Sequence, residues 1–130
     1  MNSSQMNQSN YLEELNKKFY NDDLSNAVRC GRCGSDPRII PEFIRRKTVN
    51  FAEESRELQW QAQEEIVRVL YDTVADTLVA SCWRHWCATC CCMPLHTLKC
   101  LSMTQPEIDK THKLEQELRS LKGYYQLKGC

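Results

Sequence analysis

The sequence has no long hydrophobic run and no apolar segment near its start. Its most apolar stretch, residues 66–80, is shorter than the roughly 20 residues that cross a bilayer, and it contains Arg68, Asp72 and Asp76. The opening residues, MNSSQMNQSN, are polar and lack the apolar core of a secretory signal. We therefore expect no membrane association and an intracellular protein, whose cysteine thiols stay reduced.

The sequence also lacks an excess of charge, since 17 basic and 17 acidic residues give a formal net charge of zero. This balance gives no general argument for a polyanionic partner. The charges are unevenly distributed, because residues 29–47 contain six basic and two acidic side chains, whereas residues 48–81 contain two basic and seven acidic ones. One face or end of the protein can therefore be basic although the whole chain is neutral.

Recognisable catalytic motifs are absent as well. The sequence has no HExxH motif and no deaminase-type signature. A dyad of Cys87 with His85 or His96 would supply a nucleophile and a base, but no residue pattern indicates an oxyanion hole or an orienting group. We therefore expect a binding or regulatory protein and not an enzyme.

Cysteine is the residue present in excess. Of the nine cysteines, six lie between residues 82 and 100, together with two of the three histidines. In a reducing compartment, closely spaced cysteine and histidine residues indicate metal ligands, and an odd number of cysteines does not fit a closed set of disulfides. A palmitoylation cluster at residues 90–92 is the alternative, although no membrane-directed helix adjoins it.

Two pairs of cysteines have the spacing of zinc ligands. Cys30-Gly-Arg-Cys33 and Cys87-Ala-Thr-Cys90 each separate two thiols by two residues, and a structural zinc ion needs four ligands in a tetrahedron. The sequence therefore predicts a zinc ion that joins the two halves of the chain. A second ion is the further alternative, with Cys82, Cys92, His96 and Cys100 as one ligand set, and other divisions of the ligands stay open. The candidate ligands for one or two zinc ions are Cys30, Cys33, Cys82, His85, Cys87, Cys90, Cys92, His96 and Cys100.

The hydrophobic pattern predicts a mainly α-helical fold: a small zinc-stapled helical domain with one long central helix and a C-terminal helix. Residues 51–82 contain no glycine or proline and carry apolar side chains at helical spacing, so we expect a single helix there. A short helix is expected to start at Asn10, and Ile39 and Ile40 are interpreted as either a very short strand or an apolar clasp that ends at Pro41. The predicted division is a disordered N-terminus at 1–9, a zinc-binding helical domain at 10–103 and a C-terminal helix region at 104–130.

The last predicted helix begins at Thr104-Gln-Pro-Glu107, which has the form of a capping box, and ends near Gly123. Its core-type side chains recur at spacings of three and four residues. They are Thr111, Leu114, Leu118, Leu121 and Tyr125. This stripe either packs on the protein's own domain or forms a coiled coil that makes a homodimer or a higher homo-oligomer.

The basic stretch suggests contact with RNA. Zinc knuckles with adjacent basic side chains contact phosphates, and nearby aromatic rings such as Phe43 and Phe51 are suited to stacking on bases. The alternative is a solvated patch that pairs with the acidic residues after it. The candidate RNA-binding residues are Arg29, Arg32, Arg38, Arg45, Arg46 and Lys47.

The arrangement of these motifs resembles that of the small cysteine-rich proteins of rod-shaped plant RNA viruses, of the hordei-, peclu-, furo- and benyvirus type. The resemblance rests on the early CGRC sequence, the dense HWCATCCCMPLHTLKC cluster and the heptad-like last helix. It implies zinc binding, RNA binding, self-association through the last helix and suppression of the host's RNA silencing. It also implies a location in the host cytoplasm, with the nucleus or nucleolus as alternatives.

By position, the resemblance implies zinc ligands at Cys30, Cys33, Cys87, Cys90, His96 and Cys100, and RNA contacts at Arg32, Arg45, Arg46 and Lys47. Small duplex RNA is the target that it implies, held through its phosphates without reading of the base sequence. The alternative function is a zinc-stabilised protein–protein interaction adaptor that has no RNA role and docks a partner on its acidic helix.

Overall fold

The computed structural model describes residues 23–31 and 36–124. Within these residues every regular element is a helix and there is no strand, so the mainly α-helical fold class is confirmed. The short helix expected to start at Asn10 lies outside the described residues. The helices are α2 (Asp23–Cys30), α3 (Ile39–Asn50), α4 (Arg56–Ala75), α5 (Ser81–Cys90), α6 (Cys92–Leu101) and α7 (Gln105–Tyr124).

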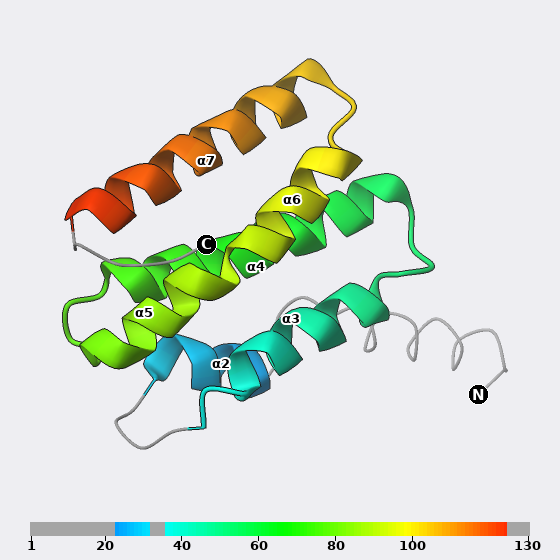
Figure 1. Ribbon diagram of the computed structural model, residues 1–130. Helices are drawn as coiled ribbons and strands as arrows, with labels where there is room; N and C mark the ends of the chain where they lie inside the picture. The colour runs from blue at the N-terminus through cyan, green and yellow to red at the C-terminus, as the bar shows by residue number, and fades with distance from the viewer. Residues whose placement is uncertain (1–22, 32–35, 125–130) are drawn as a thin grey trace, which may run out of the picture.

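Helix α4 is the centre of the fold and contacts each of the other helices. It runs behind α6, with α7 on one side and α2 and α3 on the other (Figure 1). Its predicted apolar stripe is confirmed, because Ile66, Leu70 and Val74 are fully buried. The buried Tyr71 hydroxyl donates to the Leu114 carbonyl at 2.6 Å, which ties α7 to this core.

The predicted helix over residues 51–82 is wrong in its length. Helix α4 begins after Ser55, whose hydroxyl accepts from the Leu58 N–H at 3.3 Å, and it ends at Ala75. Asp76 adopts an extended backbone, and its carboxylate accepts from the Leu78 N–H at 3.0 Å. A side chain that binds the following backbone in this way competes with the helix, and it does so without any glycine or proline.

The interpretation of Ile39 and Ile40 as a strand is also wrong, because both residues lie in α3. Pro41 does not stop this helix. It lies in the first turn, where the backbone N–H that proline lacks has no partner within the helix. The fully buried Ile40 and Phe43 then fix α3 on the core.

The start of α7 agrees with the sequence-based expectation, because the Thr104 hydroxyl and the Glu107 carboxylate form the predicted capping box. Helix α6 precedes it, with Pro94 in its first turn. The stripe on α7 packs inward, because Thr111, Leu114 and Leu118 are buried. Of the two alternatives for this stripe, the structure shows packing on the protein's own domain, and self-association through α7 stays a prediction.

The capping box predicts a pH-dependent stability. Hydrogen bonds from the backbone N–H groups of Met103 and Thr104, followed by the Arg56 guanidinium at 2.9 Å, lower the pKa of Glu107 to about 2. A carboxyl whose pKa is lowered by folding stabilises the folded state above its ordinary pKa. That contribution is lost as the pH falls towards the folded value.

We therefore expect the wild-type protein to lose stability to urea between about pH 4.5 and pH 2, and Glu107→Gln to show a smaller loss over the same range. Urea denaturation followed by circular dichroism at a series of pH values measures both slopes. If stability changed equally with pH in the two proteins, the lowered pKa of Glu107 would be contradicted.

Candidate functional site

The end of α2 is joined to α5 by Trp83. The indole N–H donates to the Val28 carbonyl at 2.8 Å, and the side chain is 2% exposed. Gly31 lies so close to the indole that a β-carbon there would overlap the ring. The first half of the CGRC sequence is therefore held against the helix that starts the second cysteine cluster.

The thiols near this joint are exposed. Cys30 lies at the end of α2 and Cys82 in the first turn of α5, and both are free cysteines. His85 is half-buried one turn further along α5, with its ring edge-on to Trp86 at 6.4 Å between centroids. Cys33 lies outside the described residues. The described chain thus brings Cys30, the first member of the first predicted pair, towards the start of α5.

Two of the cysteines have a different environment. Cys87 and Cys91 are fully buried in the hydrophobic core, and Cys91 donates its S–H to the Cys87 carbonyl at 3.2 Å. Burial raises the pKa of Cys87 to about 12 and raises the pKa of Cys91 well above its ordinary range. Both are therefore protonated packing thiols in this form, and a metal at Cys87 would have to displace a proton from a desolvated sulfur.

The remaining predicted zinc ligands, Cys92, His96 and Cys100, lie on α6. His96 and Cys100 are exposed, and the His96 Nε2 is 3.6 Å from the Cys100 Sγ. Cys92 is disulfide-bonded and is not a free thiol in this structure. In residues 23–31 and 36–124, no three histidine, cysteine, aspartate or glutamate side chains gather as a metal site. The second predicted set, Cys82 with Cys92, His96 and Cys100, is therefore not assembled.

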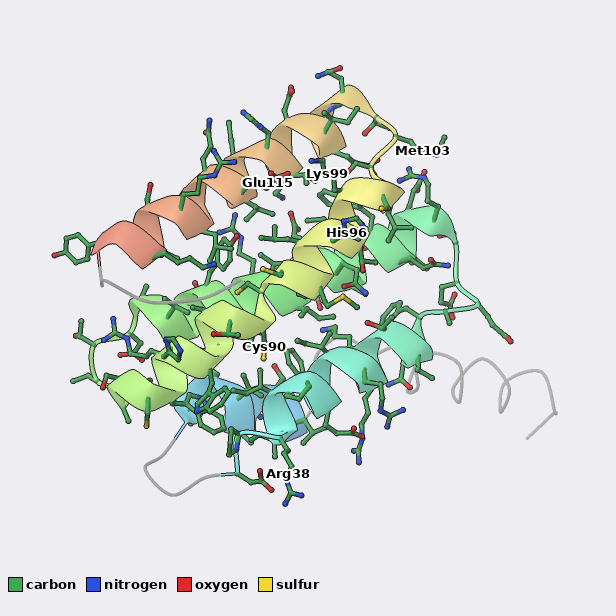
Figure 2. All side chains as sticks on the ribbon, viewed as in Figure 1. Arg38, Cys90, His96, Lys99, Met103 and Glu115 are labelled. Carbon is green, nitrogen blue, oxygen red and sulfur yellow. The ribbon has the colours of Figure 1, made fainter. Side chains whose placement is uncertain are left out.

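A cavity of about 310 Å³ is lined by residues of α6 and α7. His96 and Lys99 on α6 and Glu115 on α7 lie at this cavity (Figure 2), and the Lys99 ammonium is 3.8 Å from the Glu115 carboxylate. The exposed His96–Cys100 pair therefore sits beside a paired lysine and glutamate and supplies two metal ligands at most.

The predicted RNA-binding residues are paired with carboxylates wherever the chain is described. Arg29 binds Asp76 at 2.8 Å, and Arg38 binds Asp36 at 2.7 Å. The remaining described pairs are Arg45 and Arg46 with Glu42, and Lys47 with Glu65. Arg32 lies outside the described residues.

Two of these pairs differ in their surroundings. The Lys47 side chain is 4% exposed, so its charge is unavailable to a partner. Arg45 and Arg46 are each 60% exposed and share one carboxylate, and they lower the pKa of Glu42 to about 2. One positive charge therefore remains at the surface of α3.

A groove between α3 and α6 was missed by the sequence analysis. It has a volume of about 380 Å³, and Cys90, at the end of α5, lies between α6 and α3 (Figure 2). Its apolar lining is made by Pro41, Ile44, Val49, Cys90, Met93 and Pro94. The spacing of Pro41, Ile44 and Thr48 on one helix face would have indicated it, had residues 39–50 been interpreted as a helix.

Comparisons with known proteins give no relative for this chain. No family model matches the sequence, and no curated protein or solved structure shows a significant match. Among the described helices, none is both long enough and apolar enough to cross a membrane.

Loss of the hydrogen bond from Trp83 is expected to destabilise the protein, most strongly around α2. Trp83→Phe keeps an aromatic ring but removes the shorter of the two hydrogen bonds to the buried Val28 carbonyl, which then accepts only from the Gly31 N–H at 3.4 Å. We therefore expect a loss of about 2 kcal/mol in the free energy of unfolding. Urea denaturation measures this loss, and amide hydrogen exchange is expected to rise most in α2.

Trp86→Phe is the matched control. Trp86 lies on the same helix but is 48% exposed, so its substitution is expected to change stability by less than about 0.5 kcal/mol. A similar loss for both variants would show that the Val28 hydrogen bond has no special role.

Proposed function

We propose that this chain is a zinc-stabilised protein-interaction module without catalytic activity. The observation that carries the proposal is the contrast between two surfaces. The described basic residues of the 29–47 stretch each have a carboxylate partner, whereas the groove between α3 and α6 is apolar and open. Intramolecular pairing lowers the charge available for phosphates, and an open apolar groove suits a protein partner.

The zinc part of the proposal rests on the joint at Trp83. Cys30 and Cys33 would supply one pair of ligands, and the start of α5 offers Cys82 and His85 near the end of α2. Thiolate and imidazole are the ligands that structural zinc takes. The ion would hold the CGRC segment on α5 and would add its binding energy to the stability of the fold.

Native mass spectrometry of the full chain, with and without a chelator, tests this part. We expect one or two zinc ions per chain, loss of an ion in Cys30→Ser, and a lower thermal midpoint after chelation. Cys91→Ala is the control, since that thiol packs in the core, and it is expected to retain the full zinc count. A well-ordered chain that takes up no zinc would refute the zinc proposal.

RNA binding, which the resemblance to the viral cysteine-rich proteins implies, is the second candidate function. The observation that favours it is the single uncompensated positive charge where Arg45 and Arg46 share Glu42. Suppression of RNA silencing through small duplex RNA would use this surface of α3. One exposed charge is a weak phosphate site, so we place protein interaction first.

A gel-shift assay with small duplex RNA separates the two candidates. The variant is Arg45→Gln with Arg46→Gln, and Lys47 stays unchanged because its removal would leave Glu65 without its partner. The control is Arg68→Gln, an exposed arginine on α4 that pairs with Glu117. We expect no shifted band for the wild type or for either variant.

A shifted band that disappears in the double variant and persists in Arg68→Gln would establish RNA binding at α3. It would then replace protein interaction as the function of this surface. Circular dichroism of both variants shows that a lost band is not caused by unfolding.

A further inference from the structure

One residue that lines the groove between α3 and α6 has an unpaired hydrogen-bond acceptor. Gln63, on α4, contributes to the groove wall and is 3% exposed. Its carbonyl oxygen Oε1 has no hydrogen-bond partner. A buried carbonyl without a donor is destabilising, and native proteins contain few of them. The wall of the groove therefore holds a buried acceptor that a donor reaching it from the groove would satisfy.

The orientation of the Gln63 amide is fixed by its neighbour Thr48. The Thr48 hydroxyl donates to the Ile44 carbonyl at 2.7 Å, so its proton is already used. The hydroxyl oxygen accepts from the Gln63 Nε2 at 2.9 Å. If the amide turned over, two oxygens without a shared proton would face each other. The unpaired group is thus the acceptor and not the donor of the amide.

The chemistry of the groove selects among possible occupants. A hydroxyl or an amide that entered would bring its own acceptor into an apolar site and leave it unpaired, and a charged donor would lose its hydration. An indole ring has a single N–H donor and no acceptor, and it is otherwise apolar. Tryptophan side chains are also frequent in the central pockets of protein interfaces.

We propose that the groove binds a tryptophan side chain of a partner protein, with the indole N–H donating to Gln63 Oε1. This inference rests on the proposed interaction function and names its docking surface. The groove supplies proline faces from Pro41 and Pro94 and the sulfur atoms of Cys90 and Met93, which pack well against aromatic rings. Because Oε1 exposes less than 1 Å² in this form, the ring enters by displacing a side chain, and Met93 is unbranched and 71% exposed.

The charge at the rim indicates the neighbour of that tryptophan. Arg45 lines the groove and shares the Glu42 carboxylate with Arg46, which leaves one positive charge at the groove edge. A carboxylate next to the tryptophan would pair with it. The partner segment is therefore an apolar one that carries a tryptophan beside an acidic residue.

Two ring compounds of matched shape test the hydrogen bond. Indole and benzofuran differ in that only indole has an N–H donor. Titration into the ¹⁵N-labelled full chain is followed through the backbone amide signals of Ile44 and Met93, which line the groove and are present in every variant. We expect indole to bind about fivefold to tenfold more tightly than benzofuran. In Gln63→Met the preference for indole is expected to disappear, and in Thr48→Val it is expected to shrink because the amide can turn over.

Gln61→Met is the matched control. Gln61 lies on the same helix but is exposed, so the preference for indole is expected to remain. Equal affinities of the two rings for the wild type, or no binding of either ring, would overturn the tryptophan site. Such a result would leave the zinc and RNA experiments unaffected, so the failure of this site is distinguishable from the failure of the proposed function.

The acidic neighbour is tested with two tryptophan derivatives. N-acetyltryptophan carries a carboxylate, and N-acetyltryptophanamide does not. We expect the acid to bind more tightly, with an advantage that falls as salt is added and disappears when Arg45 and Arg46 are both changed to glutamine. If the acid and the amide bound equally well to the wild type, the proposal that an acidic residue lies beside the tryptophan would be overturned.

Discussion

The indole of Trp83 determines how the two cysteine-bearing parts of the chain meet. A buried indole N–H needs an acceptor, and here the acceptor is the Val28 carbonyl in the last turn of α2. Gly31 follows directly and has no side chain that could push the ring away. The start of the CGRC sequence, at Cys30 and Gly31, is therefore constrained by a contact that involves no metal ligand. A zinc ion in this region would strengthen an existing joint and would not have to create it.

Desolvation divides the cysteines into two chemical classes that their spacing does not reveal. Cys87 and Cys91 are one turn apart on the inner side of the cluster, where burial favours the neutral thiol. Cys30, Cys82 and Cys100 are exposed. Because zinc binds thiolates, the exposed class is the better source of ligands. A CxxC pair such as Cys87 and Cys90 is thus weaker evidence for a zinc site when one of its thiols packs in the core.

The sequence predicted those parts of the fold that depend on neighbouring residues. The capping box of α7 follows from residues within one turn. The end of α4 depends instead on Asp76, which an apolar pattern continuing to residue 80 conceals. Helix α3 was missed because a proline after two isoleucines is compatible with a strand end as well as with a first helical turn.

The site was less predictable than the fold, for a related reason. The pairing of Arg45 and Arg46 with Glu42 follows from spacings of three and four residues on a helix, and knowledge of α3 would have revealed it. The partners of Lys47 and Arg29 are distant in sequence, at Glu65 and Asp76, and only the folded chain identifies them. The groove has the same origin, since its lining comes from α3, α4, α5 and α6.

The unpaired oxygen of Gln63 connects the stability of the fold with its proposed use. A leucine or methionine at this position would pack in the same wall without a buried acceptor, so glutamine is the less stable choice for an isolated protein. The cost is offset if a donor enters the groove, because the hydrogen bond then forms where water does not compete for it. The same reasoning explains why Thr48 matters. By fixing the amide it keeps the acceptor available, and it makes the groove selective for a donor over a purely apolar ring of equal size.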